Sequence, residues 1–202
     1  MTIDNSKVPT RWYQWWPILC GGTGMTIAYT LWATGPWSLY NKPSLERMAI
    51  AVTILGVIAG LTRALASRDR FHSLLAVVAV IVLLREIHWE WTTKFVYIAL
   101  AAVTVVGLIW RDKVIGYLHR HPMVRVWFTS TVLTYVLSQA IARRAFRGIM
   151  PNEEPVYSDM EELVEVVSHL MLVITILVGP WFPKAKTPAP TPASETPSAQ
   201  TA

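Results

Sequence analysis

The sequence predicts an all-α integral membrane protein, folded as a bundle of about six transmembrane helices. Apolar residues make up 53% of the 202-residue chain and charged residues only 15%, against about 25% in a typical soluble domain. A chain with so few charges cannot cover a water-facing surface. The apolar residues also gather in runs that do not alternate and are much longer than membrane β-strands, so the spanning elements are expected to be helices.

A helix rises 1.5 Å per residue, so about 20 mainly apolar residues are needed to cross the hydrocarbon core. The first run, 15–34, contains three glycines and has no cleavage site of the kind that follows a signal peptide. The second, 48–65, carries Gly56 and Gly60, a spacing of small residues that lets helices approach closely. The third extends from about 71 to 84 and then meets a charged segment.

The remaining three runs lie in the second half of the chain. The fourth, 95–110, is short but free of charged residues. The fifth, 124–141, is diluted by serine and threonine, which leaves five helices as the alternative to six. Serine and threonine hydroxyls in such a run more often form hydrogen bonds between helices than line a path for an ion. The sixth, roughly 162–181, starts acidic and ends in a purely apolar stretch.

The predicted organisation is a cytoplasmic N-terminal segment at 1–14, a transmembrane domain at 15–183 and a tail at 184–202. The tail is rich in proline, threonine, alanine and serine and has no aromatic or large aliphatic residue. It cannot bury enough apolar surface to offset the entropy of ordering, so it is expected to be disordered.

The loop charges predict the orientation. Six crossings put both termini on one side of the membrane, and 11 of the 18 basic residues fall on that side. The positive-inside rule therefore predicts an inner-membrane protein with both termini in the cytoplasm. Nine of the 13 acidic residues fall on the opposite side, so the two acidic motifs share the outer half of the membrane.

The first motif, Arg85-Glu86-Ile87-His88-Trp89-Glu90, ends the third run. In a continuing helix Glu86 and Glu90 share one face, while Arg85 and His88 lie on another. One interpretation is an interfacial cap, because charges and tryptophans gather at headgroup depth. The other is one half of a composite site. In that case Arg85 can form a bidentate ion pair with a carboxylate of the last helix, Glu162 or Glu165.

The second motif places Glu161 or Glu162, Glu165 and His169 on one helical stripe. Eight of the nine residues after His169 are apolar, so His169 is expected below the interface, where ionisable groups are costly and indicate function. The structural alternative is that the first two glutamates favour the helix N-terminus while His169 makes a hydrogen bond across the bundle.

Together the motifs predict a site for a proton or a cation. A divalent metal is a further hypothesis, although metal sites in helical bundles typically use Glu-x-x-His pairs and the spacings here differ. A single cysteine excludes disulfides within the chain and multi-cysteine metal sites, and no hydrolase or nucleotide motif is present. The residues expected to bind the proton or cation are Glu86, Glu90, Glu162, Glu165 and His169, supported by Arg85 and His88, and the expected metal ligands are Glu86, Glu90, Glu165 and His169.

The segment from Leu84 to Glu90, with the Glu-Glu-Leu-Val-Glu of the last helix, resembles a group of uncharacterised small bacterial membrane proteins. These carry an Arg-Glu-x-Asp-like motif and a later Glu-Glu-x-x-Glu motif. His88 stands where that group has an acidic residue. The resemblance implies a multi-pass membrane fold and no established activity.

The function expected from these observations is that of a transport-related or accessory protein without enzymatic activity. The alternatives are a membrane-embedded metalloenzyme, an oxidoreductase or hydrolase, and an assembly protein that recruits a partner through its tail. The expected partners are the lipid bilayer and either another membrane protein or a second copy of this chain. Nucleic acid is excluded, because no basic stripe with interleaved aromatics is present.

Overall fold

The computed structural model describes residues 11–34, 42–87, 92–145 and 154–181, and all the regular structure in these ranges is helical. The predicted all-α class is therefore confirmed for the described part of the chain. The elements are a 3-10 helix η2 (Trp12–Ile18) and the α-helices α1 (Leu19–Thr34), α2 (Lys42–Ser67), α3 (Arg70–Glu86), α4 (Thr92–Ile109), α5 (Arg111–Arg120), α6 (Pro122–Ala142) and α7 (Glu154–Leu177).

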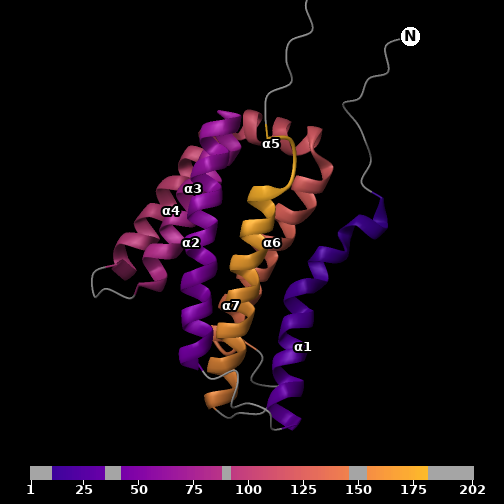
Figure 1. Cartoon of the computed structure of the whole chain (residues 1–202), viewed down its shortest axis with the longest axis vertical. Coiled ribbons are helices and arrows are strands. Elements are labelled where there is room, and N and C mark those ends of the chain that lie inside the picture. Colours follow the sequence, from indigo (N-terminus) through magenta and orange to yellow (C-terminus); the bar gives the residue numbers. More distant parts are fainter. Residues whose placement is uncertain (1–10, 35–41, 88–91, 146–153, 182–202) are drawn as a thin grey trace, which may run out of the picture.

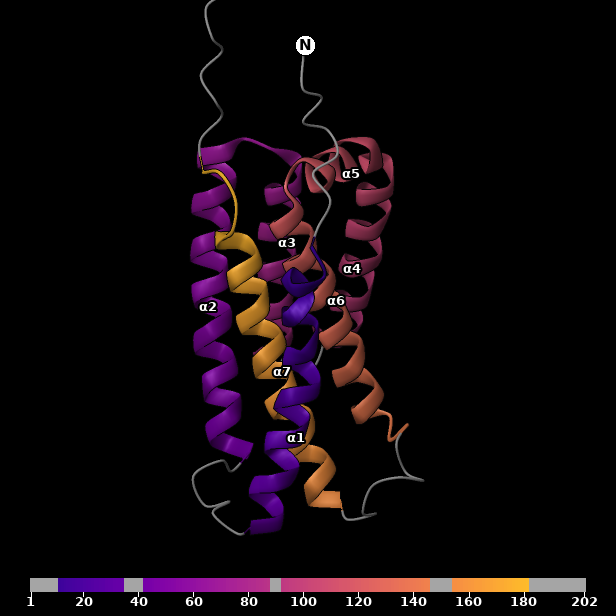
Figure 2. The same cartoon turned by 90° about the vertical axis from the view of Figure 1, so that its right-hand side faces the viewer.

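Helix α7 lies in the middle of the bundle, packed against α2, α6 and α1, while α3 packs on α2 and α4 lies at the outside against α3 (Figure 1). Figure 2 shows the same arrangement from the side, with the turn between α2 and α3, helix α5 and the end of α7 at one end of the bundle. Each of the six predicted runs corresponds to one α-helix. The end that carries α5 is called the α5 end below.

One helix was not predicted and one helix start was wrong. The residues after α4 form the additional helix α5, which buries Tyr117 and leaves Arg111 and Lys113 exposed. The first run was expected to be helical from Trp15, but α1 begins at Leu19 and the residues before it form η2, which contains Pro17. Proline has no N–H to donate within a regular helix.

The helices differ in how well they meet the requirement for a membrane span. Among the described residues, α2 alone is long and apolar enough by itself, and Lys94–Ile109 with Arg111–Arg120 forms a second candidate that is bent by 76°. Helices α1 and α3 have 16 and 17 residues, fewer than the roughly 20 that cross the hydrocarbon core. The six predicted runs are therefore helical, but six membrane spans are not shown.

The core is unusually polar and the surface unusually apolar. Among the described residues, 29 large hydrophobic side chains are exposed, whereas 20 hydrophobic and 12 polar or charged residues are buried. Helices α6 and α7 contribute much of the polar interior. For example, the hydroxyls of Thr131 on α6 and Thr175 on α7 lie 2.9 Å apart and share a hydrogen bond. The expected hydroxyl contacts between helices are therefore present.

The turn between α2 and α3 is only two residues long. Arg68 has a φ of 52°, in the left-handed region that non-glycine residues rarely adopt. The Asp69 carboxylate caps α3, accepting a hydrogen bond from the His72 backbone N–H at 3.0 Å and lying 2.5 Å from the His72 ring. Burial raises the pKa of Asp69, but the two hydrogen bonds with His72 outweigh it and lower this pKa to about 2.

The closest approach of two helices in this turn region involves Gly60 on α2. A Cβ at Gly60 would lie 3.0 Å from the Ala76 Cα of α3, so only glycine allows the two backbones this spacing. The small-residue spacing of Gly56 and Gly60 therefore serves packing, as the sequence predicted.

Arg63 lies near the end of an apolar run, a position from which arginine side chains are expected to extend to the lipid headgroups, but this expectation is wrong. Its side chain is fully buried and donates hydrogen bonds to the carbonyls of Leu177, Val178 and Pro180 at 2.9, 3.2 and 2.8 Å. The guanidinium also lies 4.7 Å from the ring centre of Trp181. The last carbonyls of a helix have no partners within it, so Arg63 completes the end of α7.

Candidate functional site

Helix α7 carries the second acidic motif deeper in the bundle than the sequence predicted. The helix begins at Glu154 rather than near Glu162, and Pro155 in its first turn needs no donor there. Glu165 and His169 consequently lie about 16 and 22 Å from the start of α7, by the rise of 1.5 Å per residue. They occupy the middle of the helix rather than its first turns.

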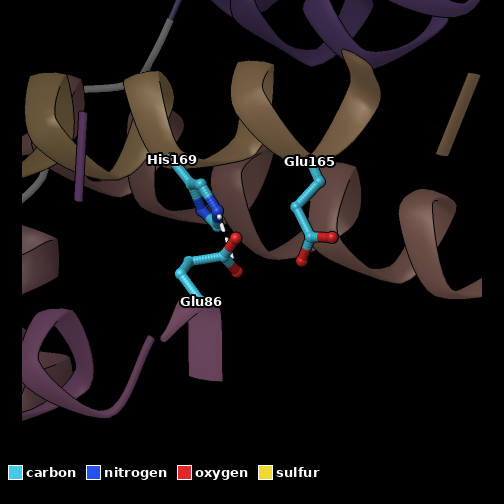
Figure 3. A group of neighbouring side chains, drawn as sticks. All are labelled: Glu86, Glu165 and His169. Carbon is cyan, nitrogen blue, oxygen red and sulfur yellow. Dashed lines mark ion pairs between the residues drawn. The ribbon is translucent and has the colours of Figure 1, made fainter. Parts of the chain in front are cut away.

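Three side chains from the two motifs converge at this level. Glu86 from α3 faces Glu165 and His169 from α7 (Figure 3), and one potential ligand atom of each lies within 4.8 Å of the others. All three are buried, with relative exposures of 7%, 4% and 1% respectively. The structure thus brings together residues that are about 80 positions apart in the sequence.

Arg85 pairs with Glu165 rather than with Glu162. Its two terminal nitrogens donate to the two oxygens of the Glu165 carboxylate, and the Nη2–Oε2 distance is 3.2 Å. The expected pairing of Arg85 with a carboxylate of the last helix is therefore confirmed. Glu162 lies away from this site and pairs with Lys42 of α2, with Nζ and Oε1 3.4 Å apart.

His169 links Glu86 to a third helix. Its Nε2 lies 3.4 Å from Oε1 of Glu86, an ion pair when the ring is protonated. Its Nδ1 shares a hydrogen bond of 2.7 Å with the hydroxyl of Tyr135 on α6. We call Arg85, Glu86, Tyr135, Glu165 and His169 the buried cluster.

Sequence reasoning missed Tyr135. It lies in the fifth run among serines and threonines, and its only signal is that its hydroxyl would need a partner in an apolar segment. Which helix packs beside α6 is a tertiary property, so the partner was not visible in the sequence. Two predicted site residues, His88 and Glu90, lie outside the described residues.

The charges of the buried cluster limit what it can bind. Arg85 and Glu165 cancel each other, which leaves Glu86 and the neutral form of His169 with one negative charge. Buried ionised groups are costly unless they are paired, so a proton or a cation placed between Glu86 and His169 lowers the cost of burying them. One proton shared between Glu86 and His169, or one monovalent cation, makes the cluster neutral. A divalent ion would leave it with an excess positive charge.

Comparison of the chain with known protein families, curated proteins and solved structures found no match in any of the three. The functional conclusion therefore depends on the geometry and charge of the buried cluster.

Proposed function

We propose that this chain is a multi-pass inner-membrane protein with both termini in the cytoplasm, whose buried cluster binds a proton or a monovalent cation. Its role is that of a transport-related or accessory protein. The observation that carries this proposal is the pairing of Glu86 with His169 beside the neutral pair of Arg85 and Glu165. Ionisable groups inside a membrane protein face the bundle interior and mark proton and ion pathways.

The membrane location is supported by the inverted polarity of the bundle. Water-soluble proteins rarely expose large contiguous apolar patches, yet here the exposed large hydrophobic side chains outnumber the buried hydrophobic residues. The short helix α1 continues directly from η2, so together they extend from Trp12 to Thr34. Arg68, Arg70, Arg111, Lys113 and Arg120 lie at the α5 end, which favours a cytoplasmic position for that end.

The chemistry of the cluster is proton exchange between two buried groups. In one state His169 is protonated: Nδ1–H donates to the Tyr135 oxygen and Nε2–H faces the Glu86 carboxylate. In the other state the Nε2 proton has moved to Glu86, which leaves a neutral ring that keeps Nδ1–H on Tyr135 and presents the Nε2 lone pair to the protonated carboxyl group. A monovalent cation that replaces this proton would be held by carboxylate oxygens of Glu86 and Glu165.

The test is the thermal stability of detergent-purified protein measured against pH, in sodium and in a large organic cation. The wild-type melting temperature is expected to depend on pH or on sodium. Glu86→Gln and His169→Gln, which keep size and hydrogen bonding, are expected to abolish this dependence. Tyr135→Phe removes the hydrogen-bond partner of His169 Nδ1. It is expected to shift the midpoint of the pH dependence of the melting temperature.

Glu46→Gln is the matched control, because Glu46 is a partly exposed carboxylate of α2 that pairs with Lys42 at 3.8 Å, away from the buried cluster. It is expected to retain the wild-type dependence. A wild type without any dependence on pH or sodium would contradict the proposal. So would a dependence that survives unchanged in both Glu86→Gln and His169→Gln.

A metalloenzyme is the second candidate function, favoured by the three buried ligand groups within 4.8 Å of one another. In that case a divalent ion would bind Glu86, Glu165 and His169, a set of carboxylate and imidazole ligands suited to iron, manganese or zinc. Arg85, which occupies both oxygens of Glu165, would have to release one of them. Stoichiometric metal in the purified wild type, absent from His169→Gln, would support the enzyme in place of the proton or cation site.

The assembly role of the tail concerns residues 184–202, which lie outside the described residues. It remains a proposal. The test is whether the chain still recruits its partner after residues 184–202 are removed.

A further inference from the structure

The α5 end of the bundle contains a polar cleft that the buried cluster does not use. The cleft has a volume of about 440 Å³ and is bounded by the α2–α3 turn on one side and by α5 on the other. Four basic residues, Arg68, Arg70, Lys113 and Arg120, line it together with two acidic residues.

Both acidic residues of the cleft are engaged. Asp69 is held by His72 of α3, and Asp112 lies 3.6 Å from Arg111. Among the described residues, Arg68 and Lys113 have no carboxylate within the 4.0 Å of an ion pair. The cleft therefore carries a surplus of positive charge.

Two side chains give the cleft a defined shape. The Arg70 guanidinium lies over the Trp110 ring, 5.0 Å from its centre, and Arg120 Nε donates to the Gly116 carbonyl at 3.0 Å. Tyr117 lines the cleft with a side chain that is 9% exposed, and its hydroxyl is directed toward Arg63.

An apolar groove begins beside this cleft. It lies between α2, α3 and α4, has a volume of about 540 Å³ and extends along α3 from Ser73 to Leu84. Ser73 is one turn from Arg70 on the same face of α3. The distance from Ser73 to Leu84 is about 16 Å along the helix, which is close to half of the roughly 30 Å hydrocarbon core.

We propose that the cleft and the groove together bind one anionic phospholipid of the cytoplasmic leaflet. Its phosphate occupies the basic cleft near Lys113 and Arg120, and one acyl chain follows the groove along α3. Basic pockets between helices on the cytoplasmic side are suited to anionic headgroups. The lipid inference rests on the membrane location proposed above and is independent of the proton or cation site.

The test uses detergent-purified full chain, with the melting temperature measured on addition of phosphatidylglycerol, phosphatidylcholine or inorganic phosphate. Phosphatidylglycerol is expected to raise the melting temperature by several degrees, and the other two additions much less. The double variant Lys113→Gln/Arg120→Gln is expected to weaken the apparent affinity for phosphatidylglycerol by roughly tenfold or more, from the attraction that each surface charge contributes. Lys94→Gln/Arg143→Gln, at the other end of the bundle, is the matched control and is expected to change nothing.

The groove is tested separately with Ala99→Trp, which fills it from α4, against Ala101→Trp on the exposed side of the same helix. Ala99→Trp is expected to reduce the rise in melting temperature on addition of phosphatidylglycerol, and Ala101→Trp is expected to leave that rise unchanged. Equal stabilisation by inorganic phosphate would replace the lipid with a free anion. Equal stabilisation by phosphatidylcholine, or none by any addition, would overturn the site. Retention of the chain in membranes washed with alkaline carbonate tests the membrane location independently.

Discussion

Arg63 and Arg85 are both drawn into the bundle, and the way each is neutralised separates a structural arginine from a candidate functional one. Arg63 is fully buried and bonded to three backbone carbonyls of the segment that ends α7. Arg85 is partly exposed and bonded to the carboxylate of one side chain, Glu165. Backbone carbonyls cannot be titrated or removed, so the first arrangement is permanent. A carboxylate can gain a proton or bind another cation, so the second can change state.

The two regions also differ in their surroundings. Next to Arg85 lie two further groups that exchange protons, Glu86 and His169, joined to a phenol on α6. Near Arg63 lie the Trp181 ring, the carbonyls that Arg63 binds and the Tyr117 hydroxyl, but no carboxylate within the distance of an ion pair among the described residues. The comparison indicates that one end of α7 is held in place and that its middle is where charge can move.

The largest expected effect comes from Arg63→Met. It leaves three buried carbonyls without their donor, and we expect a loss of stability of about 3–5 kcal/mol. Thermal denaturation in detergent measures it, with Arg143→Met as the control because Arg143 is exposed at the end of α6. A melting temperature equal to that of the control would show that Arg63 does not hold the end of α7.

A smaller effect, about 2–3 kcal/mol, is expected from Arg85→Met, because it leaves the Glu165 carboxylate buried beside Glu86 without its partner. Partial exposure of Arg85 reduces the effect through solvent screening. Since the partner here is a side chain, Arg85→Met/Glu165→Gln is expected to regain most of the lost stability in a double-mutant cycle.

This recovery is what distinguishes the two arginines. No second substitution can remove the carbonyls that Arg63 binds, so no comparable rescue is expected there. If the losses from Arg85→Met and Glu165→Gln simply add, the two residues are uncoupled. The neutral pair on which the charge argument depends would then be wrong.

The smallest expected effect concerns pH at the α5 end, where Asp69 caps α3. Its pKa is lowered from 3.8 in the unfolded chain to about 2, so its contribution is complete above the unfolded value and is lost as pH falls from about 4 to about 2. The difference in melting temperature between wild type and Asp69→Asn, which keeps the cap, is expected to be constant above about pH 5 and to shrink below pH 4. A difference that does not vary with pH would show that the charge of Asp69 does not stabilise the fold.

Part of the site could be predicted from sequence, and Arg85 and Arg63 show where the limit lies. Arg85 stands among charged neighbours at the end of an apolar run, so a carboxylate partner was expected, with Glu162 and Glu165 left as alternatives. Arg63 stands alone near the end of a run, which fits a side chain that reaches the headgroups as well as one that caps another helix. The choice depends on which helix end lies beside it.

The sequence by itself determined the helical class, the positions of six helices and the two motifs that carry the ionisable residues. These are local properties, set by apolar run length and by the spacing of side chains around one helix. Only the tertiary structure decided that α7 begins at Glu154, that Glu165 rather than Glu162 meets Arg85, and that Tyr135 is the partner of His169. Each of these follows from how the helices are rotated and placed against one another, and residues far apart in the chain carry no sign of that placement in their local pattern.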